Sequence, residues 1–301
     1  MKPLRPLVLT LIAGLCLSMP AFAEQSSATK PLDEETRKLQ ESAKKGDAQS
    51  QLLLGESYEY GRLAPKDYEE AVKWYKKSAE QGNATAQYNL GYLYDKGEGV
   101  SQDYDEAAEW YTKSAEKGNA SAQNNLGYMY DKGLGVSRDC AEALKWYKKS
   151  AEQGNAYAQN NLGYMYDKGN CVPQDFVEAV KWYTKSADQG NAGAQNNLGY
   201  MYEKGDGAPQ DYAEAVKWYR KSADQGNTTA QYNLGYMYEK GHGVAKDHVE
   251  AHKWYNLSAA YSKDRDEREK SVKNRNMLVS KMTQQQVTDA QKLAREWKPS
   301  K

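Results

Sequence analysis

The sequence predicts an all-α fold: a right-handed α-solenoid of six 36-residue helix-turn-helix repeats with a capping helix at each end. A tryptophan recurs every 36 residues without an insertion, at Trp74, Trp110, Trp146, Trp182, Trp218 and Trp254. A Leu-Gly pair recurs in the same register, from Leu54-Gly55 to Leu234-Gly235. The composition agrees, because 25 Tyr and two Phe among 301 residues suit thin stacked layers with partly wet rings better than a thick core.

Residues 1–23 have the pattern of a secretory signal peptide. Lys2 and Arg5 precede an apolar run from residue 7 to residue 19, and Ala21-Phe22-Ala23 forms a small-x-small cleavage site before Glu24. A membrane anchor would need about 20 apolar residues, and this run is shorter. We therefore expect cleavage between Ala23 and Glu24 and a protein that is periplasmic or, as the alternative, secreted.

Residues 24–45 are interpreted as a linker and an N-terminal capping helix. The stretch from Leu32 to Lys45 resembles the second helix of a repeat without its first helix, because Ser42-Ala43 lies 36 residues before Ser78-Ala79. The six repeats then follow at 46–81, 82–117, 118–153, 154–189, 190–225 and 226–261.

The second repeat illustrates how each unit is divided into two helices. Asn83 is a good N-cap, which predicts a first helix from Ala84 to Lys96, and Gly97 can end it in the left-handed conformation. Asp103 followed by Glu106 is a capping-box pattern that starts the second helix. The pattern recurs as Asp67/Glu70, Asp139/Glu142, Asp175/Glu178, Asp211/Glu214 and Asp247/Glu250.

Each helix carries an apolar stripe toward its partner. The stripe of the second helix consists of Ala107, Trp110, Tyr111, Ser114 and Ala115. The first helix contributes Ala86, Leu90 and Tyr94, and Gly91 allows close packing. The pair is therefore predicted to form an αα-hairpin.

The repeat pattern ends after Ala260, and residues 262–301 are divided into a charged segment and a capping helix. Thr283-x-x-Gln286 predicts that this helix begins near residue 284 and continues to about Trp297. Its apolar side chains would cover the end of the sixth repeat: Val287, Ala290, Leu293, Ala294 and Trp297.

The consensus Ala-x-Ala-Gln-x-Asn-Leu-Gly-Tyr-x-Tyr-x-x-Gly-x-Gly-Val, continued by Asp-x-x-x-Ala-x-x-Trp-Tyr-x-Lys-Ser-Ala-x-x-Gly-Asn, closely resembles the Sel-1-like repeat family, which is tetratricopeptide-like. The resemblance covers residues 46 to about 297. It implies an exported bacterial adaptor or scaffold, with roles in envelope signalling, secretion, polysaccharide export or contact with host proteins. A cysteine-rich branch is linked to weak penicillin binding and hydrolysis, but this chain lacks a cysteine pair in every repeat.

The charge balance argues against two classes of partner. Loss of the two basic residues of the leader leaves 39 basic residues against 41 acidic ones, without a basic face or a charge block. Nucleic acid and anionic membrane are therefore not expected partners, and the mature chain is not expected to be an integral membrane protein.

No catalytic constellation is recognised. All three histidines lie in the sixth repeat, and His248 and His252 are spaced i, i+4, but Glu250 is misplaced for a zinc-protease motif and a metal site needs a third ligand. His248 stands where other repeats carry Tyr. We interpret the pair as packing residues, and we predict no metal, no cofactor and no enzyme activity.

Two cysteines remain after loss of the leader, Cys140 and Cys171. Both belong to the edge where the first helix of a repeat turns into the second, in adjacent repeats. An even number of cysteines in an oxidising compartment predicts a disulfide between the third and fourth repeats. The alternative is two unrelated substitutions.

The first helices carry a second polar stripe, and we predict that it lines the concave side and binds a partner. An Asn recurs with a Tyr three residues later, on the same helix face: Asn89 and Tyr92, Asn125 and Tyr128, Asn161 and Tyr164, Asn197 and Tyr200, Asn233 and Tyr236. Amides and phenols suit an extended peptide or a glycan. The alternative is that Asn bonds between repeats and Tyr packs the hairpin. Selectivity would come from the variable position one turn before each Asn: Thr85, Ser121, Tyr157, Gly193 and Thr229.

These observations favour a non-enzymatic protein–protein interaction scaffold or adaptor in the bacterial envelope or outside the cell, where a host protein is one candidate partner. A glycan-binding, peptidoglycan-binding or envelope-assembly module is the alternative. A weak β-lactamase-like activity is the third possibility.

Overall fold

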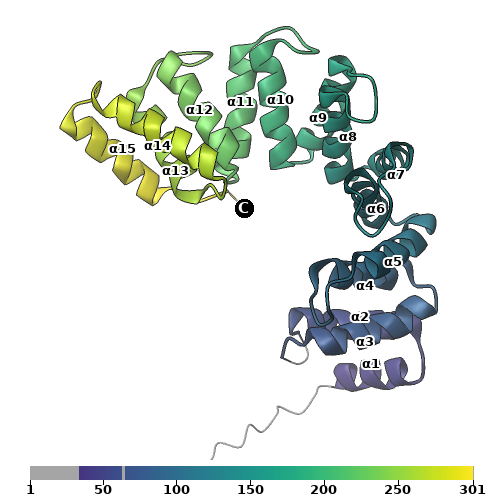
Figure 1. Ribbon diagram of the computed structural model, residues 1–301. Helices are drawn as coiled ribbons and strands as arrows, with labels where there is room; N and C mark the ends of the chain where they lie inside the picture. Colours follow the sequence, from purple (N-terminus) through teal and green to yellow (C-terminus); the bar gives the residue numbers. More distant parts are fainter. Residues whose placement is uncertain (1–33, 63–64, 301) are drawn as a thin grey trace, which may run out of the picture.

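The computed structural model describes residues 34–62 and 65–300, which form fifteen α-helices stacked side by side into an open arch (Figure 1). The first helices of the six repeats are α2 Ala48–Tyr60, α4 Ala84–Lys96, α6 Ala120–Lys132, α8 Ala156–Lys168, α10 Ala192–Lys204 and α12 Thr228–Lys240. The second helices are α3 Tyr68–Glu80, α5 Tyr104–Glu116, α7 Cys140–Glu152, α9 Phe176–Asp188, α11 Tyr212–Asp224 and α13 His248–Tyr261. The predicted α-solenoid of six helical hairpins is confirmed. The predicted signal peptide lies outside the described residues.

The first helix of each repeat begins and ends through the predicted residues. Asn83 accepts a hydrogen bond from the backbone N–H of Ala86 at 3.0 Å, and this satisfies a donor that the helix itself leaves free. Gly97 ends α4 at φ 70°, in the left-handed region where glycine is not strained. α4 therefore has the bounds that the sequence predicts.

The second helix begins differently from the capping box that the sequence suggests. Asp103 accepts from the backbone N–H groups of Asp105 and Glu106 at 3.0 Å, as expected. The Glu106 carboxylate, however, accepts a hydrogen bond from the indole Nε1 of Trp110 at 2.8 Å. The reason is spacing, because Trp110 lies one turn further along the same helix and its buried N–H needs an acceptor. Glu178 and Glu250 bond Trp182 and Trp254 in the same way.

The core is divided into small clusters between successive helices. A side-chain carbon placed on Gly91 would lie 2.9 Å from the ring of Tyr111, so this glycine makes room for a fully buried tyrosine. The other five repeats repeat the contact, from Gly55 with Tyr75 to Gly235 with Tyr255. The helices are therefore held close by ring-on-glycine packing at the same level in every repeat.

Two recurring hydrogen bonds fix the helices against one another. Within a repeat, the Ser114 hydroxyl donates to the carbonyl of Ala84 at 2.6 Å. Between repeats, Gln87 Nε2 donates to the carbonyl of Ala79 at 3.0 Å. Both bonds add a side-chain donor to a backbone carbonyl near a helix end and so tie neighbouring helices together.

The two ends of the arch are covered by extra helices. α1, Glu34–Lys44, packs on α2 as the predicted N-terminal cap. α15, Gln284–Glu296, begins with the predicted capping box of Thr283 and Gln286 and buries Val287, Ala290 and Ala294. Leu293, expected to be part of this apolar face, is 38% exposed instead, because it lies off the stripe that meets α13.

The charged segment before α15 forms a helix that the sequence analysis did not predict. α14, Arg265–Val279, begins at Asp264, whose carboxylate accepts from the backbone N–H of Glu267 at 2.8 Å. It packs on α13, where Ser271 and Ser258 share a buried hydrogen bond of 2.9 Å and Leu278 is buried. α14 and α15 together close the sixth repeat.

Candidate functional site

The tyrosines predicted to bind a partner stand at one level of successive first helices. Tyr128 and Tyr164 are 47% exposed and Tyr200 is 39% exposed, whereas Tyr92 and Tyr236 are half-buried. One turn after each tyrosine, a lysine extends over the ring, with Nζ 5.3–5.9 Å from the ring centre: Lys96, Lys132, Lys168, Lys204 and Lys240. We call these ten residues the tyrosine–lysine row. The lysines were not among the site residues predicted from the sequence, although they recur at the same 36-residue spacing.

The lysines of the row do not create a positive stripe. Each is paired with the acid that precedes it, as in Lys132 with Asp131 at 2.7 Å and Lys204 with Glu203 at 2.6 Å. The hydrogen bond to the neighbouring carboxylate raises the pKa of each of these lysines. The row is therefore a set of charge-balanced pairs beside partly exposed phenols.

The asparagines make hydrogen bonds between repeats. Asn161 Nδ2 donates to Asn124 Oδ1 at 3.1 Å, and the bond recurs from Asn197 to Asn160 at 3.2 Å and from Asn233 to Asn196 at 3.0 Å. Asn89 and Asn125 lack this partner, because Leu52 and Tyr88 stand at the corresponding positions. This is the packing arrangement that the sequence analysis named as the alternative for Asn, whereas the tyrosines remain accessible.

A second set of phenols lies beneath the surface. Tyr219 and Tyr255 are fully buried and donate to Glu203 at 2.8 Å and Glu239 at 3.0 Å. The buried hydroxyl of Tyr111, in contrast, makes no hydrogen bond of acceptable geometry. Burial raises its pKa well above the usual range, and the nearby Asn125 amide offsets only part of this effect.

A pocket of about 330 Å³ opens above Tyr111, where three successive first helices meet. α4, α6 and α8 contribute its walls, including Tyr92, Tyr128 and Tyr157. A second pocket of about 330 Å³ lies beside it and shares Tyr88 and Tyr92. The first helices therefore form a hollowed surface along repeats one to four.

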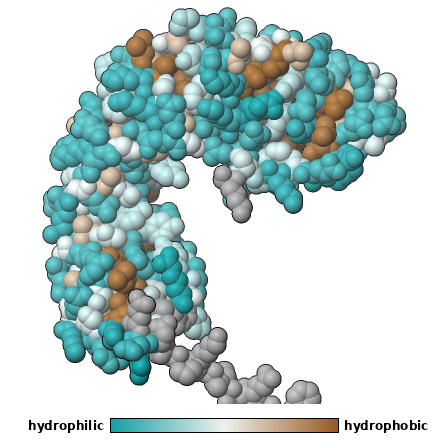
Figure 2. All heavy atoms as spheres, turned by 180° about the vertical axis from the view of Figure 1, so that it is seen from behind, coloured by the Kyte–Doolittle hydropathy of each residue, from teal (hydrophilic) through white to brown (hydrophobic). Residues whose placement is uncertain are grey.

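The remainder of the surface gives little reason to expect a long apolar groove. The side of the arch seen in Figure 2 is mainly hydrophilic, and its apolar atoms lie in small separate groups. No helix within the described ranges has the length and apolar character needed to cross a bilayer.

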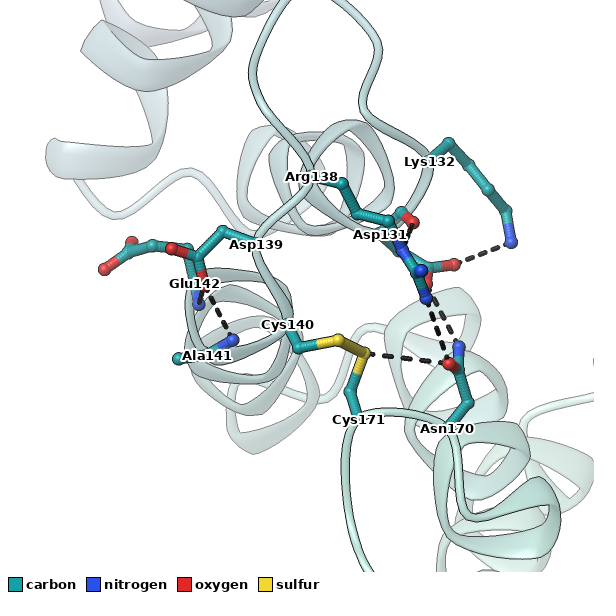
Figure 3. The surroundings of a disulfide bond; sticks show 9 residues. All are labelled: Asp131, Lys132, Arg138, Asp139, Cys140, Ala141, Glu142, Asn170 and Cys171. Carbon is teal, nitrogen blue, oxygen red and sulfur yellow. Dashed lines mark hydrogen bonds and ion pairs between the residues drawn. A yellow bond between two sulfur atoms is a disulfide. The ribbon is translucent and has the colours of Figure 1, made fainter.

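The two cysteines are joined in a disulfide, as predicted, with their Cα atoms 5.0 Å apart. Cys140 is the first residue of α7, and Cys171 lies in the turn after α8 (Figure 3). Cys171 is at φ 67° and stands where other repeats place a glycine, such as Gly135 at φ 64°. Among the described residues it is the one non-glycine with positive φ.

Asn170 adds a polar link beside the disulfide. Its amide donates to Asp131 Oδ1 at 3.1 Å, and its oxygen accepts from Arg138 Nη2 at 3.3 Å, so both bonds join the fourth repeat to the third. This boundary is the most strongly cross-linked position described in the arch, because it combines covalent and polar connections.

The histidines of the sixth repeat are packed among other side chains. The His242 ring stacks on Tyr212 at 4.7 Å, and His252 is buried. Burial lowers the pKa of His252, and the nearby Arg275 lowers it further. Across residues 34–62 and 65–300, no group of three or more His, Cys, Asp or Glu side chains could hold a metal ion.

The family model of the Sel1 repeat matches this chain six times, at residues 48–83, 84–119, 120–155, 156–191, 192–227 and 228–260. A Sel1 repeat protein from Oxalobacter formigenes is 36% identical over 74% of this chain and 94% of its own, with a TM-score of 0.67. A protective antigen of uropathogenic Escherichia coli, c5321, displays an SLR fold and is 31% identical over 87% of this chain and 70% of its own, with a TM-score of 0.38.

The Cut9–Hcn1 hetero-tetramer of the APC/C shares only the fold, at 16% identity over 81% of this chain and 46% of that chain and a TM-score of 0.54. No curated protein sequence matches this chain.

Proposed function

This chain belongs to the Sel1 repeat family, whose repeats generally act as protein-interaction scaffolds, and we propose that it binds an extended segment of a partner protein along its first helices. The observation that carries the proposal is the tyrosine–lysine row. Its partly exposed phenols recur in five successive repeats, and a bound chain could contact several of them at once.

The chemistry of the row supports a polypeptide partner. Phenols combine a rigid contact area with a polar tip that can bond backbone groups. Because each lysine of the row is paired with a carboxylate, the row does not favour a partner of either net charge. Three of the five asparagine amides that could have bound the hydroxyls of a glycan, those of Asn161, Asn197 and Asn233, already bond another asparagine between repeats, and this supports a peptide over a glycan.

We further propose that the protein is non-enzymatic and acts in the bacterial envelope or outside the cell. The predicted leader and the disulfide between Cys140 and Cys171 support export to an oxidising compartment. Purified protein should leave the β-lactam nitrocefin unhydrolysed, which separates the scaffold from a β-lactamase-like activity.

The proposal is tested by selecting binders from a phage-displayed random peptide library on the mature chain. The groove variant replaces Tyr128, Tyr164 and Tyr200 by Ala, and the control replaces Val177, a 67% exposed residue of α9, by Ala. Selected peptides should bind the wild type and the control, and should lose binding to the groove variant at an unchanged melting temperature. Failure to enrich any peptide, or equal binding to all three proteins, would contradict the proposal.

A further inference from the structure

The pocket between α4, α6 and α8 lies above a buried phenol that lacks an acceptor, in contrast to the corresponding phenols of the fifth and sixth repeats. The third and fourth repeats also carry Asp at the acceptor position, and there Asp167 accepts from Tyr183 at 3.4 Å. In the fifth repeat, Glu203 reaches the phenol of Tyr219. In the second repeat the same position holds Asp95, which pairs with Lys96 at 2.8 Å and leaves Tyr111 without a hydrogen-bond acceptor. Burying the Tyr111 hydroxyl without an acceptor for its hydrogen costs free energy. A bound group that places an acceptor at the floor of the pocket would remove this cost.

The rim of the pocket holds an aromatic side chain that other repeats lack. Tyr157 occupies the variable position of the fourth repeat. The second, third, fifth and sixth repeats carry Thr, Ser, Gly and Thr at this position. It is 69% exposed and lines the pocket together with Tyr128. Two accessible rings therefore flank the opening above Tyr111.

Most polar groups around the pocket are already engaged. Asn124 Oδ1 accepts from Asn161, and Asn124 Nδ2 donates to Asn125 Oδ1 at 3.1 Å. Asn155 Oδ1 caps α8 by accepting from the backbone N–H of Ala158. A sugar ring, with its many hydroxyls, would find few free partners here, whereas an aromatic ring with one polar tip needs only rings and one donor.

We propose that this pocket is an anchor site that binds a tyrosine side chain of the partner polypeptide. The guest ring lies between Tyr128 and Tyr157, and its hydroxyl oxygen accepts the hydrogen of the Tyr111 phenol. This assignment rests on the proposed function, and it makes the second to fourth repeats the part of the surface that selects the partner.

The probe is N-acetyl-tyrosinamide, followed by ligand-observed saturation-transfer NMR and titration against the full mature chain. Asp95→Glu should satisfy Tyr111 internally, as Glu203 satisfies Tyr219, and Tyr157→Thr restores the residue type of Thr85 and Thr229. Both variants should bind about tenfold more weakly, since each removes one favourable contact. Asp167→Glu, which makes the same change outside the pocket lining, should bind as the wild type does.

Three further probes define the chemistry of the guest. N-acetyl-phenylalaninamide lacks the hydroxyl and should bind about tenfold more weakly than the tyrosine probe. N-acetyl-leucinamide and chitobiose should show no saturation transfer. Equal binding of the leucine probe, tighter binding of chitobiose, or binding of the tyrosine probe that survives both Asp95→Glu and Tyr157→Thr would overturn the assignment.

This failure can be told apart from failure of the scaffold proposal. If selected peptides bind in a manner that depends on Tyr164 and Tyr200 but ignore Tyr157→Thr, the anchor site is wrong and the scaffold stands. If no peptide is selected at all while the tyrosine probe binds, the pocket does bind a tyrosine side chain and the extended-segment proposal is wrong.

Discussion

Tyr219 donates its buried phenolic hydrogen to Glu203 at 2.8 Å, whereas Tyr111 finds no such acceptor in Asp95. The backbone positions correspond in the two repeats, and the acids differ by one methylene group. Glu203 reaches the phenol of the second helix and Asp95 does not, whereas Asp167 in the fourth repeat accepts from Tyr183 at 3.4 Å. Small differences between near-identical repeats therefore decide which buried phenols have a hydrogen-bond acceptor and which do not.

The first prediction concerns Asp95→Glu, which should stabilise the protein by about 1 kcal/mol by adding the missing hydrogen bond to Tyr111. The melting temperature followed by circular dichroism should rise. The reverse change, Glu203→Asp, should lower it by a similar amount, since Tyr219 then loses its acceptor. A fall in melting temperature for Asp95→Glu would show that the side chain does not reach the phenol.

The second prediction concerns an amide link that the second and sixth repeats lack. Gln81, Gln153, Gln189 and Gln225 each donate Nε2 to the Oε1 of the Gln thirty residues earlier, at 2.7–2.8 Å. Lys117 stands at this position in the second repeat, and the buried Oε1 of Gln87 has no partner. Lys117→Gln should therefore stabilise the protein by about 1 kcal/mol.

Urea denaturation should show this gain as a higher midpoint. Gln153→Lys is the matched control, and it should lower the midpoint because it breaks the same link in the third repeat. If both changes leave the midpoint where it was, the amide links contribute nothing to stability.

The helices and their caps could be predicted from sequence because capping residues of the same type recur at the same positions in every repeat. Asn83 and Gly97 limit α4, and their equivalents do the same in each other repeat. α14 could not be predicted in this way. Its sequence is strongly charged and buries only Ser271 and Leu278, so it lacks an apolar stripe that would indicate a helix.

The candidate site was predictable in position but not in detail. Recurrence at 36 residues indicates a shared helix face, and it does not separate a residue that packs from one that is free to bind. Asn161 and Tyr164 recur equally, yet Asn161 bonds Asn124 and Tyr164 is 47% exposed. The pocket lies where Tyr157 departs from the other repeats and the Tyr111 hydroxyl lacks an acceptor, and its depth depends on packing between three helices, which a single sequence does not contain.

The third prediction separates the disulfide from the strained backbone at Cys171. Two variants remove the bond: Cys140→Ser with Cys171→Ser, and Cys140→Tyr with Cys171→Gly, which restores the residues of neighbouring repeats. Loss of a bond closing a loop of this length should cost about 3 to 4 kcal/mol. The Tyr/Gly variant should be more stable than the Ser/Ser variant by about 1 to 2 kcal/mol, since glycine adopts the left-handed conformation at φ 67° without a steric penalty.

Melting curves with and without dithiothreitol measure both effects. The reductant should lower the melting temperature of the wild type and leave both variants unchanged. Equal stability of the two variants would show that residue 171 carries no backbone strain once the bond is gone.

The last prediction follows from the buried imidazole of His252. Burial and Arg275 lower its pKa in the folded state below the ordinary value of 6.5, and its Nδ1 has no hydrogen-bond partner. The unfolded chain therefore takes up the proton more readily, so the protonation of this residue costs no stability above about pH 6.5 and reduces stability progressively as the pH falls below it. An apolar residue is compatible with the position of His252, since Ala108 and Val216 are buried at the equivalent position of the second and fifth repeats. His252→Val should raise the melting temperature at pH 8, because it removes an unsatisfied polar atom, and the advantage over the wild type should widen toward pH 5. A constant difference across this range would mean that His252 is protonated equally in the folded and unfolded chains.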